Sequence, residues 1–216
     1  MPQRDPAPEI SLPDRQTAGD VYVFPVSFAQ QRLWLLHQLQ PESAAYNISR
    51  ALRLVGPLVV EIFGRALNEI VRRHETLRTT FATIDGRPMQ VISEPHELHV
   101  PLIDLSARVR VEAEREAQEL FTVEAHRTFD LKRGPLFRVS VVRLDAAEHV
   151  IMFTMHHIIS DAWSVSVFVK ELTAFYQALL AEQPSPLSDL PIQYADYAEW
   201  QRKYLQGDVL ERQLAY

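Results

Sequence analysis

Apolar residues recur along this chain with two different periods, which predicts both helices and strands. Ser27 to Gln30 form a capping-box pattern, and leucines at helical spacing follow until Pro41. Helices are also predicted at residues 59–72 and 109–127, after Ser160, and from Tyr194 to Tyr216. The longest helical repeat lies after Ser160, where it comprises Val165, Phe168, Leu172, Phe175 and Leu179.

Strand patterns lie between these helices. Residues 47–55 are expected to form a strand ended by Gly56-Pro57, and residues 98–105 to form another. Two hairpins are predicted: residues 77–84 with 87–92 across Asp85-Gly86, and residues 136–144 with 149–155 across 145–148. Residues 129–134 are expected to form a loop, and Pro184-Ser185-Pro186 breaks the chain after the long helix. The mixture predicts an α/β or α+β sandwich in which helices cover a sheet.

Composition narrows the class of protein. The chain has 216 residues, 47% hydrophobic and 23% charged, as in soluble globular domains. A net charge of −6 with scattered Lys and Arg offers no electrostatic footprint for nucleic acid. Cysteine is absent, which excludes disulfides and agrees with a cytoplasmic location. No apolar run approaches the ~20 residues that span a bilayer, so no membrane contact is expected.

The most informative chemistry lies at the strand-to-helix turn that contains His156, His157 and Asp161. Neighbouring strand residues point to opposite faces, so the two imidazoles do not converge, and a metal site is disfavoured. We expect one imidazole to pack and the other to enter a cavity. There it could accept a proton from an amine or hydroxyl that attacks an acyl carbon. Two satisfied core histidines with Asp161 as a helix cap remain the alternative.

Four segments, taken in order, resemble the condensation domain of nonribosomal peptide synthetases. Residues 27–36 match the first motif of that family, with Tyr46-Asn47-Ile48 following at the usual distance. Residues 73–81 match the second motif, and residues 156–161 match the third, a His-His-x-x-x-Asp-Gly signature. Residues 194–201 match the fourth. The resemblance extends over residues 24–216.

The resemblance implies a fold and a domain organisation. The family fold is a pseudo-dimer of two lobes that resemble chloramphenicol acetyltransferase, with the active site in a tunnel between them. Residues 21–183 would form the N-terminal lobe. Residues 184–216 would form the connection and a truncated helix leading into the C-terminal lobe, whose motifs are absent. Residues 1–20 are expected to be a flexible lead-in or an inter-domain linker.

The resemblance also implies roles for single residues. His157 would lie at the tunnel centre, as a general base or as a group that orients the amine. His156 would pack, and Asp161 would form an ion pair with Arg73 or Arg78. Ala162 replaces the family's usual glycine, and we expect the change to be tolerated. Trp163 and Ser164 could line the channel, although a packing tryptophan and a helix cap explain them equally well.

The implied reaction is peptide-bond formation between substrates held on donor and acceptor peptidyl carrier proteins. The phosphopantetheine arms of the carriers, or coenzyme A, would deliver the thioester, and no cofactor or metal would be bound. One alternative is a starter condensation domain that takes a fatty acyl group from coenzyme A. Another is a non-catalytic condensation-like module that recruits a partner. A related acyltransferase with a soluble acceptor, an epimerising domain and a heterocyclising domain fit the motifs less well.

Overall fold

A four-stranded sheet forms the centre of the molecule. The computed structural model describes residues 21–215, so the predicted lead-in at residues 1–20 lies outside the described part. The strand order is β2 (Asn47–Val55), β7 (Glu148–His156), β6 (Phe137–Asp145) and β5 (Leu102–Asp104). The first three strands are antiparallel, and β5 pairs with β6 in parallel.

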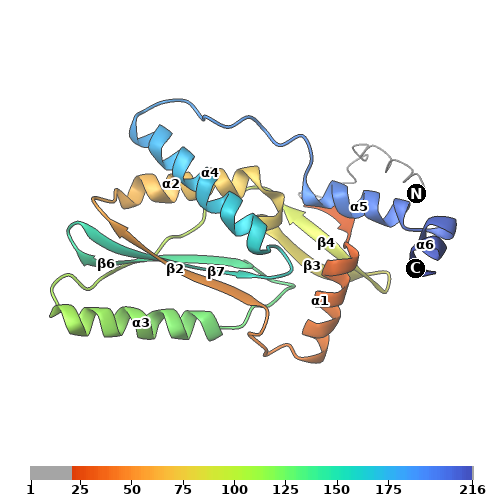
Figure 1. Ribbon diagram of the computed structural model, residues 1–216, viewed down its shortest axis with the longest axis horizontal. Helices are drawn as coiled ribbons and strands as arrows, with labels where there is room; N and C mark the ends of the chain where they lie inside the picture. Colours follow the sequence, from red (N-terminus) through yellow and green to blue (C-terminus); the bar gives the residue numbers. More distant parts are fainter. Residues whose placement is uncertain (1–20, 216) are drawn as a thin grey trace.

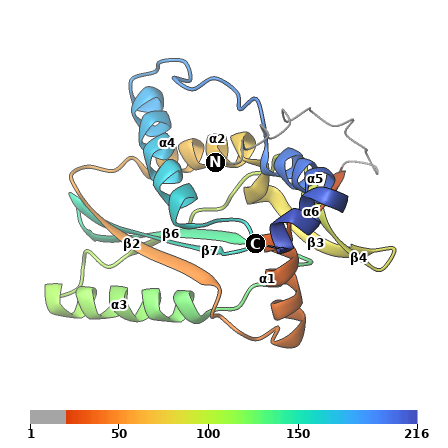
Figure 2. The same cartoon turned by 45° about the vertical axis from the view of Figure 1, so that its right-hand side comes forward.

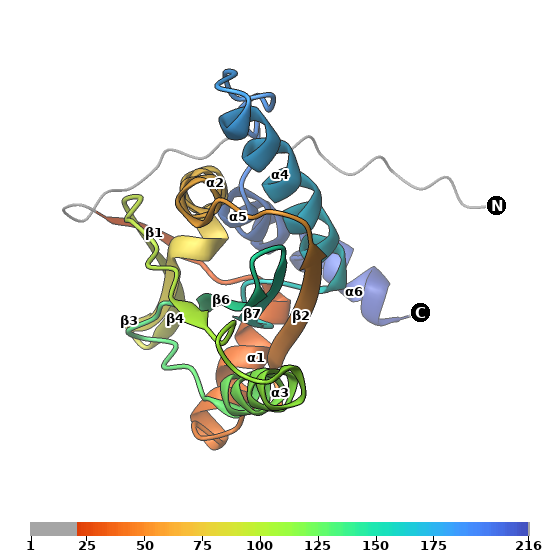
Figure 3. The ribbon, with the colours of Figure 1, turned by 90° about the vertical axis from the view of Figure 1, so that its left-hand side faces the viewer.

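Helices cover both faces of this sheet, as Figures 1 and 3 show. Helix α3 (Arg110–His126) lies on one face, and α2 (Val60–Arg73) with α4 (Ala162–Leu180) lies on the other. Side chains of β7 alternate accordingly: Val150 and Met152 pack toward α3, while Phe153 and Met155 pack toward α2 and α4. Because both faces are buried, β6 and β7 are apolar along most of their length. The predicted sandwich of helices on a sheet is confirmed.

A smaller sheet stands beside the first, in the order β1 (Val21–Pro25), β4 (Arg87–Ser93) and β3 (Thr79–Ile84), all antiparallel. The turn between β3 and β4 has positive φ at Asp85 (50°) and Gly86 (75°), as the favoured turn dipeptide requires. Helix α1 (Phe28–Leu39) follows β1, and α5 (Tyr194–Tyr204) packs against β1, which is visible in Figure 2. The predicted boundary between residues 183 and 184 stays a prediction.

Several predicted elements differ from the observed ones. The strand expected at 98–105 shrinks to β5, because Pro101 lacks an N–H and the backbone N–H of Leu98 donates to Asn68 Oδ1 instead. Leu77 belongs to a short 3-10 helix, η1 (Glu75–Arg78), rather than to the hairpin. The single helix expected from Tyr194 onward breaks before α6 (Gly207–Leu214), where Gly207 has φ +50°.

Strand β1 was not predicted, because its five residues are too few to show a clear alternation. By contrast, the bounds of β2 agree with the prediction, and the capping box at Ser27 is present with both of its hydrogen bonds. None of the helices between residues 21 and 215 is long and apolar enough to cross a lipid bilayer.

Candidate active site

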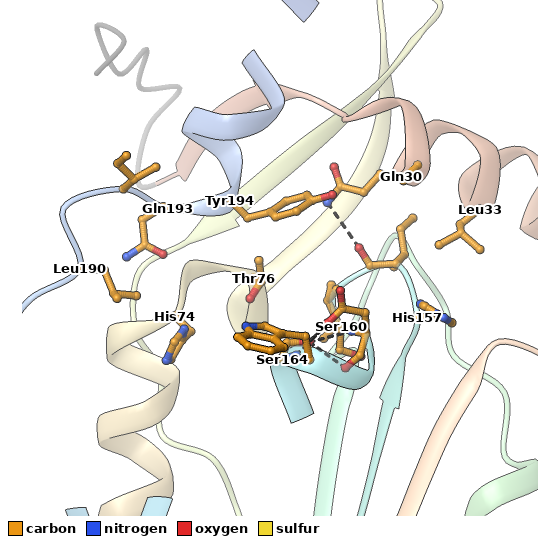
Figure 4. A pocket seen from close by; sticks show the side chains of 16 residues that line it. Gln30, Leu33, His74, Thr76, His157, Ser160, Ser164, Leu190, Gln193 and Tyr194 are labelled. Carbon is orange, nitrogen blue, oxygen red and sulfur yellow. Dashed lines mark hydrogen bonds between the residues drawn. The ribbon is translucent and has the colours of Figure 1, made fainter. Parts of the chain in front are cut away.

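The two histidines lie where β7 ends and the turn at residues 157–161 leads into α4. Figure 4 shows His157 on this turn. His156 is the last residue of β7, and His157 begins the turn. The sheet places this end of β7 beside the start of β2, since Asn47 is the register partner of His156. The backbone N–H of His157 donates to Tyr46 O over 2.8 Å, which holds the turn against the neighbouring strand.

His156 is buried among aromatic rings. Its side chain is 2% exposed, and the rings of His37, Tyr46 and Phe129 have centroids 6.2, 6.4 and 6.1 Å away. The backbone N–H of Ile158 donates to His156 Nδ1 over 3.1 Å, so that nitrogen must be unprotonated. Burial, with smaller contributions from the neighbouring histidines, lowers the pKa of His156 to about 4. His156 therefore packs as a neutral imidazole.

Acid is expected to destabilise the fold through His156. The unfolded imidazole takes up its proton near pH 6.5, whereas the folded one stays neutral until about pH 4. Stability is therefore lost as the pH falls from 6.5 to 4, by about 3 kcal/mol in all. Urea unfolding at pH 7, 5.5 and 4.5 measures the loss. His156→Asn, which keeps an acceptor for Ile158, should reduce the pH dependence, and an unchanged dependence would contradict the assignment.

His157 lies on the opposite side of the chain from His156. Its side chain is exposed and lines a cavity of about 560 Å³, while His156 lines a separate cavity of about 200 Å³. The walls of the larger cavity are mostly apolar. They are formed by the start of α1, the junction between α2 and η1, the turn itself, the start of α4 and the segment leading into α5, and include Leu33, His74, Thr76, Leu190, Ile192 and Tyr194. The side chains of His156 and His157 therefore point to opposite sides, as the alternation of side chains along a strand predicts.

Asp161 does not form the predicted ion pair with an arginine. It is the N-cap of α4, where its carboxylate accepts the backbone N–H of Ser164 over 2.7 Å. That hydrogen bond, more than any other contact, lowers the pKa of the carboxyl, and the nearby His157 contributes in the same direction.

The two candidate arginines have other partners. Arg73 Nε lies 3.0 Å from Glu171 Oε2, and Arg78 lies 3.6 Å from Glu75. Glu171 lies ten residues beyond Asp161 on α4, which places it about 15 Å further along the helix axis. Arg73 therefore pairs with an acid near the middle of α4, and the Asp161 carboxylate caps the start of that helix.

Asp161→Ala is accordingly expected to cost about 0.5–2 kcal/mol, the usual value of an N-cap. Asp161→Asn should change the free energy of unfolding little, because asparagine caps helices as well as aspartate does. Urea unfolding of the two variants beside the parent chain measures both effects. A loss of about 3–5 kcal/mol in each would instead indicate an orphaned, buried arginine.

Ala162 occupies the first residue of α4 and is exposed. Within residues 21–215 the non-glycine positions with positive φ are Asp85 and Glu182, so Ala162 carries no left-handed strain. Its tolerance stays a prediction. Trp163 is 79% exposed and lines the cavity beside His157, and Ser164 completes the capping box by accepting the backbone N–H of Asp161.

Two further residues of the site lie in the matched first and fourth motifs but were not singled out from the sequence. Gln30 lines the cavity, and its Nε2 donates to Ile158 O in the turn over 3.4 Å, as Figure 4 shows. Tyr194 lines the cavity from the start of α5, and its Oη lies 3.0 Å from Ser27 Oγ. Burial raises the pKa of Tyr194. Gln30 belongs to a capping box and Tyr194 is the first residue of α5, and such positions usually signal only a helix start, so the sequence did not show that both residues line the cavity.

No group of three or more His, Cys, Asp or Glu side chains in the described part of the chain is placed to hold a metal ion. Two imidazoles line this mostly apolar cavity. His74 Nε2 lies 2.7 Å from Glu171 Oε2, whereas the exposed His157 ring has Gln30, Thr76 and Tyr194 among the other polar residues of the same cavity. Such a site can orient an amine or a hydroxyl and accept its proton.

Comparison with known proteins agrees with the motifs. A family model described as "Condensation domain" matches residues 21–216. A linear gramicidin synthase protein from Brevibacillus parabrevis is 49% identical over 192 residues, which cover 89% of this chain and 2% of that protein. Phosphinothricin tripeptide synthetase PhsC from Streptomyces viridochromogenes is 38% identical over 213 residues, or 98% of this chain and 19% of that protein.

Two solved structures share the fold. The starter condensation domain of rhizomide synthetase RzmA aligns with a TM-score of 0.81 at 25% identity, and the first condensation domain of the calcium-dependent antibiotic synthetase aligns with a TM-score of 0.79 at 26% identity. Each alignment covers 90% of this chain and 48% of the solved chain. This chain therefore spans about half the length of the condensation domains that it matches.

Proposed function

The chain belongs to the condensation-domain family of nonribosomal peptide synthetases, and on this premise we propose that it is the N-terminal lobe of a peptide-bond-forming domain with His157 as its catalytic residue. The observation that carries the proposal is the position of His157 on a mostly apolar cavity of about 560 Å³. Ala162 and Trp163 are the first two residues of α4, which begins five residues after His157. The remaining walls of the active site would come from a C-terminal lobe, which agrees with the half-length match to the solved domains.

The proposed reaction joins an acceptor amine to a donor acyl group. The amine nitrogen attacks the thioester carbon, a C–N bond forms, the C–S bond breaks, and the electron pair of that bond leaves with sulfur. His157 removes the proton that the nitrogen loses, or orients the amine and stabilises the polar transition state. A thioester is already activated, so holding the two reactants together supplies much of the acceleration. Neither a metal nor a bound cofactor takes part.

The proposed partners follow from this chemistry. Donor and acceptor carrier proteins would each present a substrate on a phosphopantetheine arm, and the reaction would take place in the cytoplasm. Synthetases for linear gramicidin and chondramide are among the relatives, which supports a role in peptide assembly. The second candidate is a starter domain that accepts a fatty acyl group from coenzyme A. It is supported by the fold shared with the starter domain of rhizomide synthetase.

One assay separates these functions. The complete condensation domain that contains this lobe is mixed with an aminoacyl acceptor carrier and either an aminoacyl donor carrier or a fatty acyl-coenzyme A. Mass spectrometry of the acceptor arm then detects the amide. We expect product from the carrier-bound donor. Product from the acyl-coenzyme A alone would support the starter reaction, and no product from either donor would favour a non-catalytic module.

A further inference from the structure

The side-chain amide of Gln30 is buried at the junction of three parts of the lobe. Gln30 is 2% exposed and lies in the first turn of α1. Its Oε1 accepts the backbone N–H of Ser27 over 2.9 Å, which completes the capping box. Its Nε2 points away from that cap and donates twice, to Gln90 Oε1 on β4 over 3.0 Å and to Ile158 O over 3.4 Å.

The partner amide of Gln90 is fixed as firmly. Gln90 is 1% exposed, and its Nε2 donates to Pro25 O at the end of β1 over 2.9 Å. Because the Nε2 of Gln90 is used there, its Oε1 must accept, and the Nε2 of Gln30 must donate. The donor bonds thus branch at Gln30 Nε2: one branch runs through Gln90 to the carbonyl of Pro25, and the other ends on the carbonyl of Ile158.

Ile158 immediately follows His157, and its peptide groups are held on both sides. Its N–H donates to the His156 imidazole, and its C=O accepts from Gln30. Together with the bond from the His157 N–H to Tyr46 O, these contacts fix the backbone on either side of the exposed imidazole. We infer that Gln30 is a positioning residue for His157, acting through the carbonyl of Ile158. The inference rests on the proposed function.

The helix cap alone does not account for this amide. A capping box needs only the acceptor oxygen of its fourth residue, which glutamate supplies as well as glutamine does. The donor Nε2 is superfluous for the cap, yet it is buried and satisfied by two acceptors. A buried donor costs free energy unless it is paired, and here both acceptors lie outside α1, on β4 and in the histidine turn. We therefore assign the Nε2 of Gln30 a second role, which is to hold this turn.

Two substitutions at Gln30 separate the tasks. Gln30→Glu keeps the acceptor for the Ser27 N–H, but its ionised form faces the oxygens of Gln90 and Ile158. Burial raises the pKa of such a carboxyl, and the protonated form regains an O–H donor. Gln30→Met removes both tasks at similar volume. Gln38→Glu and Gln38→Met, on the exposed side of the same helix, are the matched controls.

Amide formation by the complete domain is measured between about pH 6 and pH 8. We expect Gln30→Met to lower kcat by about 10- to 100-fold at every pH, because small misplacements of a catalytic group have effects of this size. KM should change little, since the oxygen and the nitrogen of this amide are already hydrogen-bonded within the protein. The Gln30→Glu variant should be similarly slow at pH 8 and recover part of its kcat as the pH falls, while the Gln38 variants match the parent.

Hydrogen exchange of the backbone amides at residues 157–160 gives a second measurement that does not depend on activity. Exchange should be faster in both Gln30 variants, with circular dichroism reporting that each is folded. Unchanged kcat, or unchanged exchange in this segment, overturns the inference. If Gln30→Met does not fold, the pH-dependent recovery of Gln30→Glu decides. An inactive parent domain would refute the proposed function, and exchange alone would then show whether Gln30 holds the turn.

Discussion

Replacing His157 with alanine is expected to slow amide formation by about 10²- to 10⁴-fold, the range usually supplied by a positioned acid or base. The ring is exposed on the cavity and makes no packing contact of the kind that surrounds His156, so the free energy of unfolding should change by less than about 0.5 kcal/mol. The rate is measured in the complete domain with carrier-bound substrates. His99→Ala, at an exposed histidine outside this cavity, is the control.

Two further substitutions separate the possible roles of this imidazole. His157→Asn and His157→Gln retain a polar group that can orient an amine, but neither accepts a proton at neutral pH. If orientation dominates, both variants should be much faster than His157→Ala. If proton removal dominates, all three should be equally slow. A His157→Ala variant with parental kcat would remove His157 from the mechanism and leave a binding module as the better description.

The division of the adjacent histidines could be predicted from the sequence because it depends only on the geometry of a strand. Successive side chains point to opposite faces, so one of two neighbouring imidazoles had to leave the core. The bounds of β2 and the capping box at Ser27 were also predictable, because each is encoded within a few consecutive residues.

Contacts between distant segments were not predictable in this way. The partner of Arg73 depends on how α2 crosses α4, a packing geometry that no local pattern contains. Gln30 looked like an ordinary capping residue, because the sequence does not show that β4 and the histidine turn approach its amide. The short edge strand β1 acquires its structure from pairing with β4 rather than from its own five residues.

The pairing of Arg73 leads to the largest expected effect on stability. The Arg73 and Glu171 side chains are 9% and 12% exposed, and His74 Nε2 lies 2.7 Å from the same carboxylate oxygen. Arg73 also donates to the carbonyl of Ser188, so this cluster joins the end of α2, the middle of α4 and the segment that leads to α5. Because His74 lines the cavity, the cluster also supports the wall opposite the histidine turn.

Glu171→Ala should therefore lower the free energy of unfolding by about 3–5 kcal/mol, because it leaves the Arg73 guanidinium buried without its counter-charge. Urea unfolding at neutral pH measures the change. Glu119→Ala removes an equally close acid from the exposed Arg115–Glu119 pair, and it should cost less than about 0.5 kcal/mol. The double variant Arg73→Met with Glu171→Leu replaces both charged side chains by apolar ones and should recover much of the lost stability. The reason is that the penalty in Glu171→Ala comes from the unpaired, buried charge of Arg73 rather than from the lost Arg73–Glu171 attraction. Equal stability of Glu171→Ala and Glu119→Ala would show that water reaches Arg73 and that the cluster contributes little to holding α2 against α4.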